Sequence, residues 1–277
     1  MSYATSEASA RAAAEAYVAE KGAKMAHSEV VTLSIQNGDL VTGSPAGTQP
    51  GTVVSIAVLH ALNTAVAQVQ WDDRAGWLTL LLEGGSWAVI SDVTSKVERP
   101  FTISPREMTA ALSACWEEYC GANRVCDGAR MAQIFHPLCR LTYTGPDGSV
   151  VIKPRALTPC IKSNVATLAA RFASSLHVRA RLSAFAEDVF VTMVSERYST
   201  PLHAPYAHLQ GDPRVGAHDT LLGVTFATPD VAMVVLKVGH PPMLWTDVLT
   251  CARLAGDRWW IVAKSSCSEP LLADEAQ

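Results

Sequence analysis

The strongest constraint on the fold is a pattern of strands that occurs twice in the chain. In the first half, a long and mostly apolar stretch at 58–71 precedes a stretch at 76–90 that contains Leu-Thr, a Gly-Gly turn and a tryptophan. Near the C-terminus, the stretches 222–236 and 247–262 follow the same order, again with a glycine before the last tryptophan-bearing strand. A unit used twice favours two similar folds in one chain. We therefore expect two units, residues 1–100 and 101–277.

Composition narrows the class of protein. A chain of 277 residues can hold two domains that each bury a core. The net charge is -4 and the basic residues are scattered, which disfavours a nucleic acid partner. The N-terminal stretch lacks the features of a signal peptide, and no apolar run is long enough for a membrane span. The 7 cysteines show no CxxC spacing, so we expect reduced thiols, no structural metal and a cytoplasmic protein.

Local signals place helices and turns in both units. Ser104, Pro105 and Glu107 form the pattern of a capping box, which predicts that a helix begins there. A short helix over 127–135 should end at His136-Pro137, because the residue before a proline is disfavoured in helices. A strand over 138–144, a turn over 145–148 and a second strand should follow. The first unit has a predicted helix over 8–20 and a hairpin turn at Asn37-Gly38.

The two units differ most between the hairpin and the long strands. The first has only a loop over 42–51, whereas the second has a long insertion with helical patterns at 164–176 and 182–198 and a histidine-rich loop at 201–213. Only the second unit therefore has enough predicted helix to cover a pocket. We expect that pocket between the strand 245–254, the helix 106–119 and the helix 182–198.

The order of these elements resembles the lumazine-binding branch of the nuclear transport factor 2-like superfamily. The resemblance depends on Phe-His-Pro at 135–137, Asp-Gly at 147–148, Trp-Thr-Asp at 245–247 and Gly-Asp-Arg-Trp-Trp at 256–260. It covers residues 101–266 well, and 8–96 as a reduced copy. It implies an α+β fold of two cone-shaped units, each a curved antiparallel sheet packed on helices. Because this fold hosts isomerases, dehydratases, association domains and transport factors, it does not decide the function.

Three residues are candidates for catalysis in the second unit. A buried carboxylate at Asp247 would serve as a general base if desolvation raised its pKa. Alternatively, Asp247 bonds to neighbouring backbone or pairs with Arg253 or Arg258. The imidazole of His136 can act as acid or base near neutral pH, with Tyr143 as a further participant. The alternative for His136 is a structural corner in which it bonds to the backbone.

The other interpretation is a binding or assembly protein that performs no catalysis. In it, the second unit holds a small apolar or heteroaromatic molecule, or the fused pair serves as an assembly module. The aromatic residues expected to line the pocket are Trp116, Tyr119, Phe135, Phe190, Trp245 and Tyr206. The enzyme alternative is a cofactor-independent isomerase or dehydratase. No phosphate loop, dinucleotide fingerprint, nucleophile elbow or zinc-protease motif occurs, so no cofactor is expected.

Two further features concern metals and assembly. His203 and His208 have a spacing that a transition metal would tolerate, but no second cluster completes a shell, so a lid or an ordinary surface loop is the simpler interpretation. Strand alternation sends Trp259 and Trp260 to opposite faces, one into the core and one outward. We expect the outward faces of the two units to pack together as an internal pseudo-dimer, with a homodimer of the chain as the other arrangement.

Overall fold

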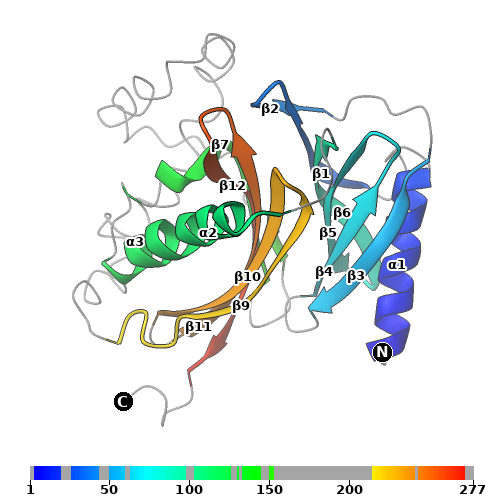
Figure 1. Cartoon of the computed structure of the whole chain (residues 1–277). Helices are drawn as coiled ribbons and strands as arrows, with labels where there is room; N and C mark the ends of the chain where they lie inside the picture. The colour runs from blue at the N-terminus through cyan, green and yellow to red at the C-terminus, as the bar shows by residue number, and fades with distance from the viewer. Residues whose placement is uncertain are drawn as a thin grey trace, which may run out of the picture.

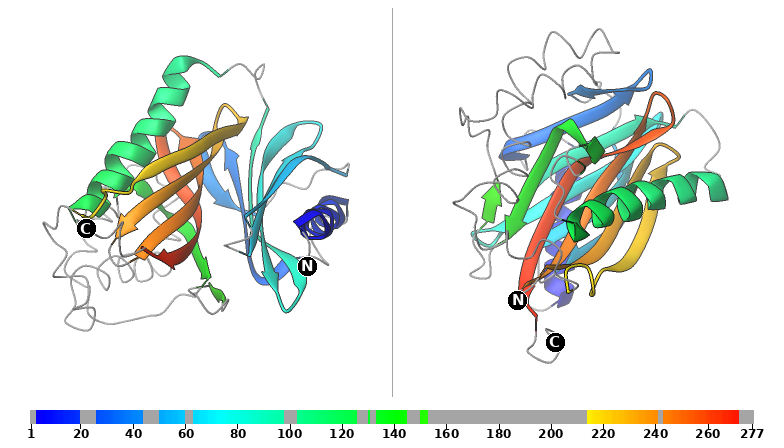
Figure 2. Two further views of the ribbon diagram at one scale, coloured as in Figure 1. Left: turned by 90° about the horizontal axis from the view of Figure 1, so that it is seen from below. Right: turned by 90° about the vertical axis from the view of Figure 1, so that its left-hand side faces the viewer.

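The computed structural model describes residues 3–19, 26–43, 50–59, 63–97, 103–125, 130, 133–144, 150–152, 214–240 and 243–271. Within these residues the chain forms two curved six-stranded sheets that lie face to face, with helices on their outer faces (Figure 1). The view from below shows the layers in sequence, from helix α2 (Pro105–Ser113) through the two sheets to helix α1 (Tyr3–Ala19) (Figure 2). The predicted α+β class with two curved sheet units is confirmed.

The first sheet comes from the N-terminal part of the chain. Its elements are α1 (Tyr3–Ala19), β1 (Ala26–Gln36), β2 (Asp39–Thr42), β3 (Thr52–Leu59), β4 (Thr64–Gln70), β5 (Arg74–Glu83) and β6 (Ser86–Lys96). The strand order is β2-β1-β6-β5-β4-β3. All neighbouring pairs are antiparallel except β1 and β6, which run parallel.

The second sheet repeats this order. Its elements are α2 (Pro105–Ser113), the π-helical segment η2 (Ala114–Cys120), α3 (Gly121–Arg124), β7 (Phe135–Thr144), β8 (Val150–Ile152), β9 (Thr220–Thr228), β10 (Val231–His240), β11 (Met243–Leu254) and β12 (Arg258–Pro270). The order is β8-β7-β12-β11-β10-β9, and β7 pairs with β12 in parallel. Each sheet is thus mixed, whereas the sequence predicted antiparallel sheets. The parallel pair joins strands far apart in the chain, so no local turn signal reveals it.

Some predicted element boundaries need correction. The two apolar stretches of the repeated pattern are not single long strands. The stretch 58–71 is divided between β3 and β4, and the stretch 222–236 is divided between β9 and β10. Strand β7 begins at Phe135, so His136 lies within a strand and not at a corner before one. The helices expected at 164–176 and 182–198 lie outside the described residues.

Other local signals agree with the structure. The Ser104 hydroxyl accepts the Glu107 backbone N–H at 3.2 Å, and the Glu107 carboxylate accepts the Ser104 backbone N–H at 2.8 Å. The capping box therefore starts α2 where the sequence predicts. Asn37 and Gly38 both have positive φ, at 52° and 83°, which is the conformation required by a two-residue hairpin turn.

An apolar layer holds the two sheets together. Buried residues of the first sheet, including Trp77 and Val93, pack with Val248, Trp260 and Val262 of the second. Polar contacts also cross the interface. The hydroxyls of Ser95 and Thr228 are 2.6 Å apart, and the Ala255 N–H donates to the Gly38 carbonyl at 2.7 Å. The sheets therefore bury their facing surfaces against one another.

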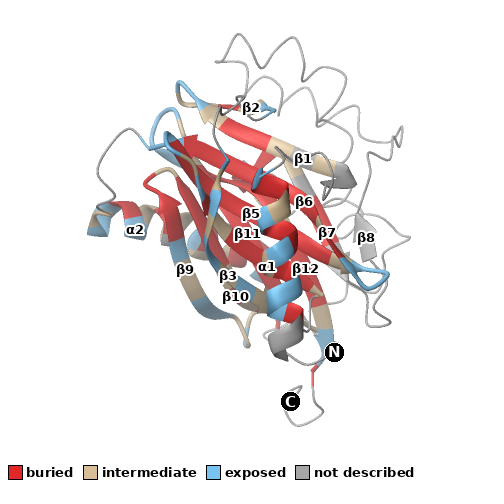
Figure 3. Cartoon of the chain, turned by 90° about the vertical axis from the view of Figure 1, so that its right-hand side faces the viewer, coloured by how far each residue is buried: buried red, intermediate tan, exposed pale blue. Residues whose placement is uncertain are grey.

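Helices cover the two outer faces. Helix α1 packs its Ala10, Ala14 and Tyr17 side against the first sheet, and the buried residues of β5 and β6 lie beneath it (Figure 3). Helix α2 and segment η2 cover the second sheet in the same way, through a cluster that includes Cys115, Tyr119 and Leu249. Among the helices that the structure describes, none has the length and apolar character needed to cross a membrane.

Candidate functional site

Asp247 lies in the middle of the second sheet, on the face that the helices cover. Its register partners are Leu236 on β10 and Ser266 on β12, and the side chain is 1% exposed. Leu249, two residues further, belongs to the cluster under the helices, whereas Val248 belongs to the layer between the sheets. Because side chains alternate along a strand, the Asp247 carboxylate points toward the helices.

One carboxylate oxygen of Asp247 is part of a buried polar cluster. The Tyr119 hydroxyl donates a short hydrogen bond to Oδ2, and the Lys264 Nζ lies 3.0 Å from the same oxygen. Lys264 also donates to the Tyr119 hydroxyl at 2.5 Å, with its ammonium 5.0 Å from the centroid of the ring. The opposite charges of Asp247 and Lys264 compensate each other where burial would penalise either one alone.

The other oxygen, Asp247 Oδ1, has no hydrogen-bond partner among the described residues. The hydroxyl of Ser266, directly across from Asp247 on β12, is also buried and without a partner in the described part of the chain. Buried polar atoms are almost always paired, so two neighbouring exceptions need an explanation. Together they offer one acceptor and one hydroxyl to a molecule placed between the sheet and its helical cover.

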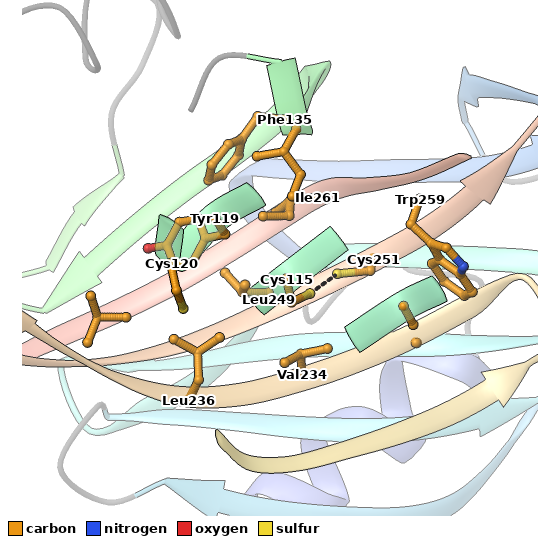
Figure 4. Close-up of a cluster of buried hydrophobic side chains, with 14 of the residues drawn as sticks. Cys115, Tyr119, Cys120, Phe135, Val234, Leu236, Leu249, Cys251, Trp259 and Ile261 are labelled. Carbon is orange, nitrogen blue, oxygen red and sulfur yellow. Dashed lines mark hydrogen bonds between the residues drawn. The ribbon is translucent and has the colours of Figure 1, made fainter. Parts of the chain in front are cut away.

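The π-helical segment places Tyr119 over this position. In η2, the buried side chains are Cys115, Tyr119 and Cys120 (Figure 4). A π turn is wider than an α turn and changes which side chains face a sheet, and such turns are frequent at functional sites. The sequence predicted an ordinary helix here, because no composition signal distinguishes a π segment from an α-helix.

Ionisable groups near the site have shifted pKa values. Burial raises the pKa of the Cys120 thiol to about 12, and the charges of Asp219 and Asp247 add to the effect. Burial likewise raises the pKa of the Cys267 thiol to about 11 and raises the pKa of Asp219 above its ordinary value. Both thiols are therefore protonated at neutral pH and do not serve as nucleophiles there.

His136 and Asp247 lie on opposite faces of the second sheet. The His136 ring packs edge-on against Trp260 in the layer between the sheets, with ring centroids 5.7 Å apart. Its Nδ1 accepts the Leu138 backbone N–H at 3.2 Å, and burial lowers the imidazole pKa to about 4. The backbone bond fits the structural alternative, although the partner is an N–H and not a carbonyl. His136 and Asp247 do not converge on one molecule.

Tyr143 is in register with the site. On β7 it pairs with Ser266, which pairs in turn with Asp247 on β11. These three residues therefore form one row across three strands. The side chain of Tyr143 lies outside the described part of the structure.

Three of the predicted aromatic residues belong to the cluster that contains Tyr119 or pack against it. The ring of Phe135 meets the Tyr119 ring edge-on, with centroids 5.9 Å apart. Trp116 and Trp245 are half-buried and pack against the same cluster. Two more predicted pocket residues and the two loop histidines lie outside the described residues, namely Phe190, Tyr206, His203 and His208. Within the described ranges, no group of three His, Cys, Asp or Glu side chains is placed to hold a metal ion.

Lys264 is the basic partner of Asp247, and the sequence analysis did not identify it. Arg253 pairs instead with Glu107 at 3.2 Å and with Asp230 at 2.6 Å, and so ties β11 to the start of α2. Arg258 stacks over Trp260, 4.0 Å from the ring centroid. A register shift between Thr250 and Cys251 places Lys264 opposite Leu249, on the same face as Asp247. Counting outward from the turn at 255–257 alone would have placed Lys264 opposite Val248, on the other face, so the turn position does not reveal this partner.

No protein-family model matches the chain, and no curated protein matches it. Some solved structures are similar to part of the chain. A nuclear transport factor 2-like protein of unknown function from Silicibacter pomeroyi is 17% identical, covers 60% of this chain and 100% of its own, and has a TM-score of 0.37. A ketosteroid isomerase-like protein from Erwinia carotovora atroseptica is 11% identical over 61% of this chain and 100% of its own, with a TM-score of 0.36.

A cystatin-like fold protein from Burkholderia xenovorans is similar at 16% identity, with a TM-score of 0.34, over 61% of this chain and 96% of its own. At such identities the likeness concerns the arrangement of the chain only. What the site binds or does must be argued from its own residues.

Proposed function

We propose that the second unit is a small-molecule-binding module of the nuclear transport factor 2-like kind, with its ligand anchored at Asp247 and Ser266. The observation that carries the proposal is the pair of buried polar atoms, Asp247 Oδ1 and Ser266 Oγ, that have no partner among the described residues. A ligand with a suitable polar group would satisfy both. The Tyr119 and Lys264 contacts to Oδ2 keep the carboxylate in place for it.

The surroundings define the class of ligand. Asp247 Oδ1 can only accept from an N–H or O–H when the carboxylate is ionised, so the ligand must present a donor. Leu236, Leu249 and Phe135 form apolar surroundings on the same side of the sheet. A small apolar or heteroaromatic molecule with one hydroxyl or ring N–H fits this combination. The third wall predicted for the pocket, helix 182–198, lies outside the described residues.

The test uses Ser266→Ala, because this change leaves the Asp247–Lys264 ion pair intact. We would screen hydroxylated enones, hydroxynaphthols and pteridines, each of which has a donor for Asp247, by thermal shift and then titrate each hit. Loss of one neutral hydrogen bond should weaken binding by about 3- to 10-fold. Asp247→Asn, which removes a charged acceptor, should weaken it by about 10- to 100-fold. The matched control is Thr94→Val, which removes a buried hydroxyl without a described partner from the first sheet.

The outcomes separate the alternatives. Weaker binding in Ser266→Ala and Asp247→Asn but not in Thr94→Val supports the proposal. Equal affinity in all three variants would mean that the ligand binds elsewhere. No hit, together with ordered water on both atoms in a crystal structure, would show that water satisfies them and would leave the assembly role.

The enzyme alternative is favoured by one observation. Lys264, Tyr119 and Asp247 form a continuous chain of hydrogen bonds along which a proton can move. An isomerase or dehydratase would use Asp247 as the base, with Tyr119 as its hydrogen-bonded neighbour, and His136 would take no part. Asp247→Asn would then reduce turnover by about 10²- to 10⁴-fold. Ligands that bind without turnover exclude this alternative for those ligands.

The fused arrangement supports an internal pseudo-dimer. The two sheets have the same strand order and pack through Trp77, Trp260 and their apolar neighbours. We propose that this packing replaces association with a second chain, so the protein should be monomeric. Sedimentation of the whole chain at micromolar concentration tests this, and a stable dimer would contradict it.

A further inference from the structure

Two buried thiols face each other beside the proposed site. The sulfur atoms of Cys115 on η2 and Cys251 on β11 are 3.5 Å apart, and each residue is 1% exposed (Figure 4). Both cysteines are reduced in this structure. A disulfide would bring the sulfurs to about 2.05 Å, so its formation needs a movement of only about 1.5 Å.

The thiol pair connects the same two elements as the polar cluster. Cys115 precedes Tyr119 by four positions on η2, and Cys251 follows Asp247 by four positions on β11. A bond between the sulfurs would therefore fix the η2 segment against the sheet close to the Tyr119–Asp247 contact. Any molecule that enters between helix and sheet would meet a cover that can no longer move away.

We propose that Cys115 and Cys251 form an oxidisable pair, converted by a hydroperoxide into a disulfide that fastens η2 to β11. In the first step one sulfur attacks a peroxide oxygen, the O–O bond breaks, and a sulfenic acid and water are formed. In the second step the other sulfur attacks the sulfenic sulfur, and the hydroxyl leaves as water after taking up the thiol proton. Two thiols and one hydrogen peroxide thus give one disulfide and two waters.

The surroundings make this reaction slow and dependent on pH. The contact with Cys251 raises the pKa of the Cys115 thiol, and burial raises it further. Only the thiolate is nucleophilic, so the rate should rise with pH and with local opening of the helix. The short distance between the sulfurs favours the second step once the first has occurred, because the partner is already in contact.

The experiment uses the full chain with Cys126 and Cys160, which lie outside the described residues, replaced by serine. The protein is treated with hydrogen peroxide at pH 8.5, its free thiols are alkylated in denaturant, and its peptides are mapped by mass spectrometry. We expect a cross-linked peptide that contains Cys115 and Cys251, is reversed by dithiothreitol, and accompanies a rise in melting temperature of about 5–15 °C. Cys115→Ser should abolish both effects.

Cys120→Ser is the matched control, because Cys120 is a buried thiol of the same π-helical segment. It should leave the cross-link and the melting shift unchanged. Cross-links that join other cysteines, or both thiols still free after prolonged treatment, would overturn the proposal. These measurements need no ligand, so their failure is distinct from a failure of the binding proposal, which Ser266→Ala tests.

Discussion

Asp92 of the first sheet and Lys264 of the second occupy the same place in their hairpins. Each lies five positions after a tryptophan, Trp87 or Trp259, at the start of its strand. Asp92 is opposite Leu78 and Lys264 is opposite Leu249. Each also contacts a tyrosine from the covering helix, since the Tyr17 hydroxyl donates to Asp92 at 3.2 Å and Lys264 donates to Tyr119.

The correspondence includes an irregularity of the backbone. Both hairpins have a register shift at the same point, after Thr79 in β5 and after Thr250 in β11. Counting from these shifts, the place of Asp247 in the second sheet is taken by Gly76 in the first. The first sheet therefore has a buried carboxylate with a tyrosine partner, and the second has a carboxylate and an ammonium together. In the second sheet, the Lys264 ammonium contacts the Asp247 carboxylate directly.

Removing Lys264 should destabilise the protein strongly. The side chain is 10% exposed and its partner Asp247 1% exposed, so Lys264→Met would leave an uncompensated buried carboxylate. We expect a loss of about 3–5 kcal/mol in the free energy of unfolding, measured in urea. The double variant Asp247→Asn, Lys264→Met should regain much of this loss.

The control for that experiment is Lys237→Met. Its ion pair with Glu269 has an equal distance of 3.0 Å, but the two side chains are 36% and 53% exposed. Solvent screening should limit the loss there to about 1 kcal/mol or less. Similar losses in the two variants would show that the buried pair contributes no more than a surface one.

Asp92 should make the protein less stable as the pH rises. Burial raises its pKa to about 7, above the ordinary value of 3.8, against opposing contributions from Tyr17 and Arg74. The folded protein therefore binds a proton that the unfolded chain releases between these values. The stabilisation is complete below about pH 4 and is lost as the pH rises through 7, at about 1.4 kcal/mol for each pH unit. The difference in unfolding free energy between the native chain and Asp92→Asn, measured in urea, should therefore change by about this amount for each pH unit between pH 4 and 7.

His136 should make the protein more stable as the pH rises over part of that range. Its pKa is lowered by burial from 6.5 to about 4, so the unfolded chain binds a proton that the folded protein excludes. Stability is lost as the pH falls from about 6.5 to 4. In the native chain this loss offsets the gain from Asp92. The Asp92→Asn variant should therefore reveal a fall in stability toward acid, and a flat profile in that variant would count against a buried neutral His136.

The parts of the fold that the sequence predicted depend on local chemistry. The capping box at Ser104 and Glu107 uses residues three positions apart, and the Asn37-Gly38 turn uses adjacent ones. The alternation of Trp259 and Trp260 follows from the strand geometry alone, and the structure places them in different clusters. Each of these signals lies within a few residues, where propensity and geometry decide the outcome.

The parts of the fold and of the site that the sequence did not predict depend on contacts between distant parts of the chain. The parallel pairing of β7 with β12 and the meeting of Tyr119 with Asp247 involve sequence separations that no local pattern encodes. Asp247 was predicted as a site residue from its type and its strand, but its partner Lys264 required the hairpin register. Ser266 had no distinguishing feature in the sequence, because a lone serine in a strand is commonplace.

Gly76 should be intolerant of any side chain. A Cβ at this position would lie 2.0 Å from the Val93 carbonyl oxygen, a backbone atom of the adjacent strand that cannot rotate away. Gly76→Ala should therefore force the two central strands of the first sheet apart and cost about 1–3 kcal/mol or more. Gly223→Ala on β9 is the control, because its Cβ would meet no atom within 4 Å and its φ is not positive. That change should be neutral or should stabilise the protein by up to about 1 kcal/mol, since alanine restricts the unfolded chain.

The measurement is the urea midpoint of unfolding of both variants. If Gly76→Ala unfolds at the same midpoint as the native chain, the close approach of β5 and β6 is wrong, and with it the correspondence that assigns Gly76 to the place of Asp247.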